Sequence, residues 1–190
     1  MTFGLPHIFW RLLAVVFAVV GMIGLTIVFA FPVLHIGRFY SIPTRAMSPT
    51  IEAGDMIYAY EWAYRDAKPR RGDVVVFSGK GISGLDEYSD VKYVKRLVGF
   101  PGESVSIHDG NIWINGKAVP ELARFNYQPA GDFANGSDSP YVVPADSYFV
   151  LGDDPQHSKD GRFLGGVPAE NLRGRAVLRL WPPTRIGEIH

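Results

Sequence analysis

The sequence predicts a mostly β protein in which an antiparallel β-sheet domain follows one N-terminal transmembrane helix. Residues 12–34 carry no charged side chain, which is typical of a membrane span. Beyond residue 51, short runs rich in β-branched and aromatic residues are separated by Gly, Pro, Asn and Asp, the pattern of strands joined by turns. Helical periodicity is nearly absent there. We therefore expect a tail over residues 1–11, a transmembrane helix over 12–34 and a β domain over 35–190.

The apolar stretch from Leu12 to Leu34 is 23 residues long. A helix of that length spans about 35 Å, against about 30 Å of bilayer hydrocarbon. The apolar region of a cleaved secretory signal is shorter, about 7–15 residues. An uninterrupted run of this length also favours lipid over a protein core. Arg11 precedes the stretch and Arg38 and Arg45 follow it, so the basic residues alone do not give its orientation.

Seven short segments are predicted as strands, at residues 56–60, 74–77, 91–98, 105–107, 112–114, 148–151 and 176–180. The β-branched run at 74–77 indicates a strand buried on both faces. Asp109-Gly110 and Asn115-Gly116 predict tight turns between strands. We expect a loop over 78–90 and a surface excursion over 121–140, because neither segment is periodic.

Composition excludes several classes of function. The 190 residues include 19 basic and 19 acidic side chains, so the zero net charge gives no reason to expect a nucleic-acid partner. The absence of cysteine excludes disulfides, cysteine nucleophiles and thiolate metal sites. No histidine has a partner at ligand spacing, so we expect no metal and no cofactor. The five histidines are His7, His35, His108, His157 and His190.

The first segment that suggests chemistry is the loop from Ser41 to Ile51, a few residues beyond the apolar stretch. Pro43 and Pro49 each fix φ and lack a donor, so this segment is predicted to be irregular. Its position places whatever it does close to a membrane.

A second candidate is Lys95, within the predicted strand 91–98. Side chains alternate along a strand, so Tyr93, Lys95 and Leu97 share one face. If that face is directed to the core, desolvation lowers the pKa of the lysine, by as much as about 3–5 units at full burial. A lysine neutral near pH 7 can act as a general base. The alternative is a solvated lysine on an edge strand, which is the commoner case.

A third candidate is the segment from Gly152 to Pro168, which begins Gly152-Asp153-Asp154. Asp160 and Arg162 are two residues apart, so they would point the same way in extended chain and could form a charge-assisted pair. The alternative is a polar surface loop whose carboxylates have no shared role.

These three segments together resemble the sequence boxes of the type I signal peptidases, which are membrane-bound proteases with a serine nucleophile and a lysine base. Ile-Pro-x-x-x-Met-x-Pro-Thr at 42–50 resembles the nucleophile box, and Tyr-Val-Lys-Arg-Leu-Val-Gly-Phe-Pro-Gly-Glu at 93–103 resembles the lysine box. Gly-Asp at 152–153 and Ser-x-Asp-x-Arg at 158–162 resemble the last box. The order and spacing also fit that family. The departures at Asp154 and Gly161, where many members carry Asn and Ser, are mild.

The resemblance implies a role for individual residues. Lys95 would be the general base, Thr44 an oxyanion donor together with the N–H of residue 46, and Met47 and Pro49 would contact the substrate. The supporting residues of the last box would be Gly152, Asp153, Ser158, Asp160 and Arg162. The resemblance implies that Ser158 hydrogen-bonds near the lysine. At the nucleophile position, however, the chain has Ala46. Ser48 lies about 6–7 Å further along an extended chain, so we do not expect it to replace that serine.

The family cleaves signal peptides from exported preproteins after small–x–small sites. The expected partners are therefore preprotein signal peptides and the lipid bilayer, with the secretion machinery as a further candidate. The expected location is the bacterial inner membrane, with a single span and the catalytic domain on the outer, periplasmic side.

The alanine has two interpretations. One Ser-to-Ala change with the other boxes intact is typical of an engineered, inactive form of the peptidase. The alternative is a natural pseudoenzyme that binds signal peptides at the membrane. Two further hypotheses are a self-cleaving repressor with a related Ser-Lys fold, which the apolar stretch disfavours, and a β domain used only for interaction. The last requires three ordered resemblances to arise by chance.

Overall fold

The computed structural model describes residues 7–65, 67–85 and 91–190, and the side chains of 7–9 and 27–36 are outside that description. The chain divides into two units, Met1–Ile36 and Gly37–His190. The first unit contains α1 (His7–Ile36), a helix of 30 residues. Over the part of the chain that the structure describes, no helix meets the length and hydropathy expected of a membrane span. The span predicted over 12–34 falls partly on side chains outside the described residues.

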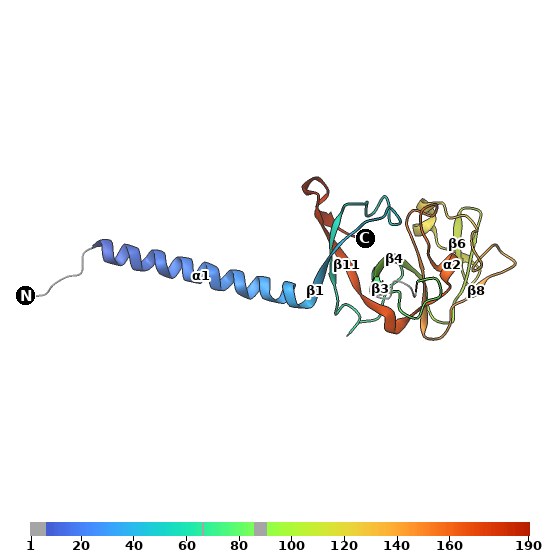
Figure 1. Ribbon diagram of the computed structural model, residues 1–190, viewed down its shortest axis with the longest axis horizontal. Coiled ribbons are helices and arrows are strands. Elements are labelled where there is room, and N and C mark those ends of the chain that lie inside the picture. Colours follow the sequence, from blue (N-terminus) through green and yellow to red (C-terminus); the bar gives the residue numbers. More distant parts are fainter. Residues whose placement is uncertain (1–6, 66, 86–90) are drawn as a thin grey trace, which may run out of the picture. The chain divides into compact units, whose positions relative to one another are not determined.

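The second unit is built on a large antiparallel sheet (Figure 1). Its strands are, in spatial order, β1 (Gly37–Ser41), β2 (Met56–Tyr60), β11 (Leu172–Trp181), β3 (Val74–Ser78), β4 (Lys92–Gly99), β9 (Ser147–Leu151) and β10 (Val167–Pro168), with β12 (Gly187–Glu188) paired to β11. Every residue of β3 is buried, as the β-branched run predicts.

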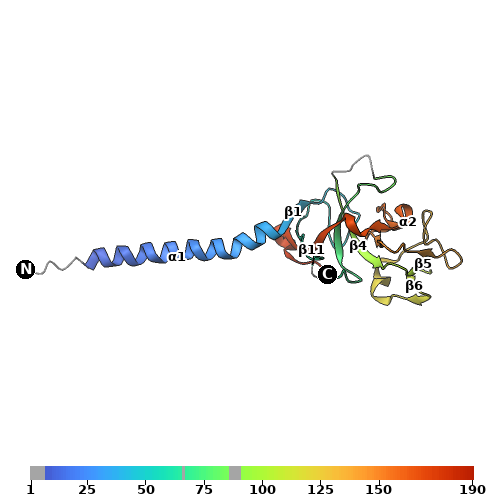
Figure 2. The same ribbon diagram turned by 90° about the horizontal axis from the view of Figure 1, so that it is seen from below.

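A second antiparallel sheet has the order β7 (Lys117–Ala118), β6 (Asn111–Ile114), β5 (Ser104–His108) and β8 (Tyr141–Val142). Figure 2 shows β5 and β6 side by side. The predicted turns join these strands, and all four of their residues have positive φ: Asp109 and Asn115 at 54° and 50°, Gly110 and Gly116 at 73° and 74°. This is the conformation that Asn-Gly and Asp-Gly adopt most readily.

All seven predicted strands overlap strands of the structure, so the mostly β fold is confirmed. Five short strands were not predicted: β1, β7, β8, β10 and β12. Short helical segments complete the unit, namely η2 (Pro120–Phe125), α2 (Gly161–Leu164), η3 (Ala169–Asn171) and η4 (Pro183–Arg185).

The surface excursion expected over 121–140 needs correction. Leu122, Phe125, Tyr127 and Ala134 from this segment are buried in a cluster that also contains side chains of both sheets. An irregular segment shows no periodic pattern even when it covers a core, which is why the sequence did not indicate this. Of the loop expected over 78–90, residues 86–90 lie outside the described residues, whereas Ile82 and Leu85 are buried.

Candidate active site

Ala46 lies in a turn-rich loop between β1 and β2. Backbone hydrogen bonds fix this loop: the N–H of Ser48 donates to the Arg45 carbonyl at 2.8 Å and the N–H of Ile51 donates to the Met47 carbonyl at 2.8 Å. Ala46 and Met47 are buried, whereas Thr44 is exposed. The side chain of Met47 packs in an apolar cluster with Ile51 and Val74, so it also anchors the loop to the sheet.

Lys95 is in the middle of β4, paired with Val75 of β3. Only 5% of the residue is exposed. Its Nζ donates to the Val94 carbonyl at 3.2 Å. Desolvation by burial lowers the pKa of Lys95, although the carboxylates of Asp160 and Asp153 act in the opposite direction. The solvated-lysine interpretation is therefore wrong, and the amine is a candidate base by the criterion of a lowered pKa.

The loop and the strand meet at one cavity of about 280 Å³. Thr44, Ala46 and Met47 line it from the loop, and Lys95 lines it from the strand. Further lining residues are Tyr40, Ser41, Ile42, Pro43, Val91, Lys92, Tyr93, Val94, His157 and Lys159. The structure thus brings together Ala46, Thr44 and Lys95, for which the resemblance implies the nucleophile position, an oxyanion donor and the base.

The third box packs directly behind Ala46. A Cβ at Gly152 would lie 2.1 Å from the Ser158 Oγ and 2.4 Å from the Ala46 carbonyl oxygen, so this position has room only for glycine. The N–H of Asp154 donates to that same Ala46 carbonyl at 3.1 Å. Ser158 is buried, and its Oγ has no hydrogen-bond partner among the described residues, so the hydrogen bond expected for it near Lys95 is not formed in this structure.

Two buried ion pairs hold this box in place. The Arg96 Nε and Nη2 donate to the two carboxylate oxygens of Asp153 at 2.7 and 2.5 Å, and Thr50 Oγ1 donates to the same carboxylate at 2.5 Å. Asp160 receives hydrogen bonds from the Arg162 Nε at 2.9 Å and from the Gly152 N–H at 3.0 Å. The Asp160–Arg162 pair is the one expected from the sequence, and it orders the start of α2.

Comparison with known proteins gives the family of the chain. The family model described as "Signal peptidase, peptidase S26" matches residues 9–181. The chain belongs to the signal peptidase family. It is 38% identical over 170 residues to a signal peptidase I of Leptolyngbya laminosa, which covers 88% of this chain and 80% of that protein. It is 33% identical over 157 residues to thylakoidal processing peptidase 1 of Arabidopsis thaliana, covering 78% of this chain but less than half (43%) of that protein.

A solved structure of a signal peptidase I from Enterococcus faecalis is also similar. It shares 29% identity with this chain, at a TM-score of 0.46, and covers 57% of this chain and 97% of that one.

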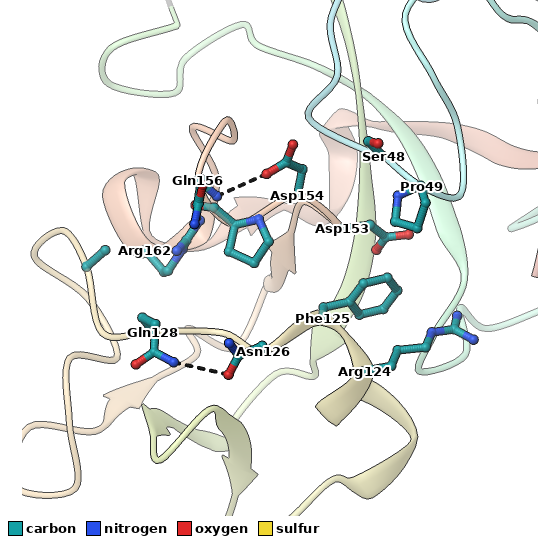
Figure 3. Close-up of a pocket in the computed structure, with 12 residues that line it drawn as sticks. Ser48, Pro49, Arg124, Phe125, Asn126, Gln128, Asp153, Asp154, Gln156 and Arg162 are labelled. Carbon is teal, nitrogen blue, oxygen red and sulfur yellow. Dashed lines mark hydrogen bonds between the residues drawn. The ribbon is translucent and has the colours of Figure 1, made fainter.

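This signal peptidase chain directs Ser48 away from the cavity that Lys95 lines. The Ser48 Oγ donates to the Glu52 Oε1 at 2.8 Å. Ser48 lines instead a second, larger cavity of about 470 Å³, together with Pro49 (Figure 3). The Ser48 hydroxyl is therefore already bonded, and Ser48 is not among the residues that line the cavity with Lys95.

Three residues near this candidate site were not singled out from the sequence. Arg96 and Thr50 bind Asp153, and the Tyr127 hydroxyl donates to the Gly152 carbonyl at 2.9 Å. Arg96 directly follows the lysine and Thr50 closes the first box, so their positions inside the boxes were the available signal. Tyr127 lies in an aperiodic segment and gave none.

Proposed function

We propose that this chain is a type I signal peptidase in which the site for the signal peptide is complete but the attacking atom is missing. The observation that carries the proposal is one cavity lined by Ala46, Thr44 and the buried, desolvated Lys95. Alanine keeps the backbone N–H of position 46 and lacks only the Oγ. The chain as written is therefore expected to bind signal peptides and to leave them uncut.

With serine at position 46 the reaction would follow the Ser-Lys scheme. The neutral Lys95 Nζ would take the Oγ proton as the Oγ–carbon bond forms, and it would return that proton to the leaving amine. Water would then hydrolyse the acyl-serine ester, again with Lys95 as base. The N–H of residue 46 and the Thr44 hydroxyl would stabilise the oxyanion, each contributing roughly 3–4 kcal/mol.

The substrate would bind as an added β-strand. Among the described strands, β1 pairs with β2 alone, and the last residues of β1 continue into the lining of the cavity. Main-chain hydrogen bonds to such an edge supply affinity, whereas pockets supply specificity. A cavity of about 280 Å³ with Ile42, Met47 and Val94 in its wall suits small apolar side chains, as small–x–small cleavage sites provide.

We also propose that α1 anchors the chain in a membrane as a single span, with Gly37–His190 on the outer, periplasmic side of a bacterial inner membrane. The support is the uncharged stretch from Leu12 to Leu34 and the membrane-associated family. An anchored site would meet its substrate in the same bilayer, since a signal peptide is itself an apolar helix.

The alanine at position 46 has two possible origins within this proposal, a single replacement in a competent enzyme or the natural decay of the site. The buried pairs Arg96–Asp153 and Asp160–Arg162 are intact, as is the desolvated lysine. A site that had drifted for long without selection for catalysis would be expected to lose some of these groups. This favours a single Ser-to-Ala replacement in an otherwise competent site over a decayed, natural signal-peptide binder.

The experiment is cleavage of a preprotein with a small–x–small site, in detergent, by this chain and by its Ala46→Ser variant. We expect no product from the first and a single cut after the signal from the second, abolished by a further Lys95→Met change. The rate of Ala46→Ser should rise with pH around a midpoint below the ordinary lysine pKa of about 10.4.

Two results would contradict the proposal. If Ala46→Ser is folded yet inert, the peptidase assignment fails and the binding-protein alternative replaces it. If the unchanged chain cuts the preprotein, position 46 is not the nucleophile position and Ser48 becomes the residue to test.

A further inference from the structure

The larger cavity next to the candidate active site has no role in the chemistry described above. It has a volume of about 470 Å³ and is bounded by the residues that follow Ala46 and by the loop that follows Gly152. Figure 3 shows the segment 124–128 along one wall and the segment 153–156 along the other. The lining residues that matter here are Ser48, Pro49, Asn126, Gln128, Asp154 and Gln156.

Residues 46–48 and 154–157 form a ridge between the two cavities, because neighbouring members of each segment line different cavities. Ala46, Met47 and His157 line the smaller cavity, whereas Ser48 and Asp154 line the larger one. The ridge is crosslinked, because the Asp154 N–H donates to the Ala46 carbonyl and the Asp154 carboxylate lies 2.9 Å from the His157 Nδ1. Arg45 adds an ion pair to the same carboxylate at 3.6 Å. Residue 46 is therefore on the boundary between the cavities.

This boundary has a direct meaning for a bound preprotein. If the small side chains before the scissile bond occupy the smaller cavity, the scissile carbonyl lies at residue 46. The chain that continues beyond the bond must then cross the ridge. The next surface that it meets is formed by Ser48, Pro49, Asp154 and Gln156, which is the wall of the larger cavity.

The chemistry of the larger cavity suits a peptide backbone. Asn126, Gln128 and Gln156 each carry a side-chain amide. Such an amide can both donate and accept hydrogen bonds, as can the backbone of every non-proline residue of a peptide. Gln128 and Gln156 are both exposed. Among the described residues, their side chains make one hydrogen bond, from the Gln128 Nε2 to the Asn126 Oδ1 at 3.1 Å. These amides can bond a peptide backbone whatever its side chains are, which fits mature N-termini of varied sequence. The cavity also has charged lining residues, of which Asp153 and Arg162 are held in the buried ion pairs described above.

We infer that the larger cavity binds the first residues of the mature protein, just after the scissile bond, through its side-chain amides. This inference rests on the proposed function, since it takes the smaller cavity as the site for the signal-peptide end. The two cavities then form one substrate channel, in which the signal-peptide side selects small residues and the mature side adds sequence-tolerant affinity.

The test uses the full chain in detergent. Because the chain has Ala46, we expect it to bind peptides without cutting them. One fluorescent peptide ends at the scissile position, and a second continues for roughly four mature residues, about 13 Å of extended chain. We expect the longer peptide to bind about tenfold more tightly, as two additional hydrogen bonds would give. The double variant Gln128→Ala/Gln156→Ala should remove this difference and leave the affinity of the shorter peptide unchanged.

Asn135→Ala is the matched control, because Asn135 is an exposed amide outside the cavity lining. Equal affinity for the two peptides, or an advantage of the longer peptide that survives in the double variant, overturns the inference and leaves the proposed function standing. Failure of the folded chain to bind either peptide overturns the proposed function, and the inference with it. The shorter peptide also reports folding of the double variant, since its binding does not involve the altered residues.

Discussion

At the scale of single residues, Lys95 combines burial with a charge that the fold disfavours. Desolvation lowers its pKa in the folded protein, so the unfolded state binds more protons at any pH between the folded pKa and about 10.4. Stability therefore falls as the pH is lowered through this window. A neutral side chain of similar length has no such cost.

Lys95→Met should consequently stabilise the protein at neutral pH. The melting temperature of the variant should exceed that of the unchanged chain by almost nothing above a pH of about 10.4. The difference should grow as the pH falls toward the pKa of the lysine in the folded protein. Thermal unfolding of the two proteins across a pH series measures this. A constant difference at all pH values would mean that the lysine has the same pKa in the folded and unfolded states, and that it is no candidate base.

Gly152 is the second residue whose side chain matters for the site, because an added Cβ would collide with the loop that contains Ala46. Gly152→Ala would put a Cβ against the Ala46 carbonyl oxygen, a backbone atom that cannot rotate away. We expect a loss of about 1–3 kcal/mol in the free energy of unfolding and weaker peptide binding, because the loop of residue 46 must shift. Gly187→Ala is the control, since nothing lies within 4 Å of its Cβ and its φ is not positive. Equal stability of the two variants would show that the packing behind Ala46 yields easily.

At the scale of elements, the pair Arg96–Asp153 joins β4 to the loop behind Ala46. Both side chains are almost fully buried, at 2% and 0% exposure. Asp153→Ala would leave the guanidinium buried without its carboxylate, so we expect a loss of about 3–5 kcal/mol in stability. Glu61→Ala, which breaks the more exposed pair with Arg38, should change stability by about 0–1 kcal/mol. Chemical denaturation of both variants measures the contrast, and similar losses would contradict the structural role assigned to the buried pair.

The same strand shows what sequence could and could not predict. Alternation along β4 placed Tyr93, Lys95 and Leu97 on one face but left open whether that face is buried, and the structure shows that Lys95 is buried. Alternation did not indicate that Arg96, on the opposite face, is buried too, because its partners Asp153 and Thr50 are far away in sequence. Long strands and tight turns follow from local pattern. The two-residue strands depend on partners that only the folded chain provides, as Val167–Pro168 does on β9.

At the scale of the whole molecule, the boxes of the candidate site are distributed over segments that tertiary structure assembles. Their order and spacing located Ala46, Lys95 and Ser158 in the sequence. The larger cavity that we assign to the mature chain was not foreseen, because five of its twelve lining residues belong to the segment 124–130, which looked like a surface excursion. Irregular segments show no periodic sequence pattern. Their contribution to a site can therefore be seen only in the folded structure, where they lie beside the other segments that line the cavity.

The division of the chain at Ile36 leads to a prediction about anchoring and binding. Among the described residues, the hydrophobic clusters draw their members from 40–189, so a chain shortened to residues 37–190 should fold and bind the peptides above with unchanged affinity. The full chain should stay with membranes during alkaline carbonate extraction, whereas the shortened chain should be released, since it lacks the uncharged stretch from Leu12 to Leu34. Release of the full chain by carbonate would contradict the proposed anchor. Loss of peptide binding on shortening would instead show that α1 takes part in recognition, and the added-strand description of binding would have to include it.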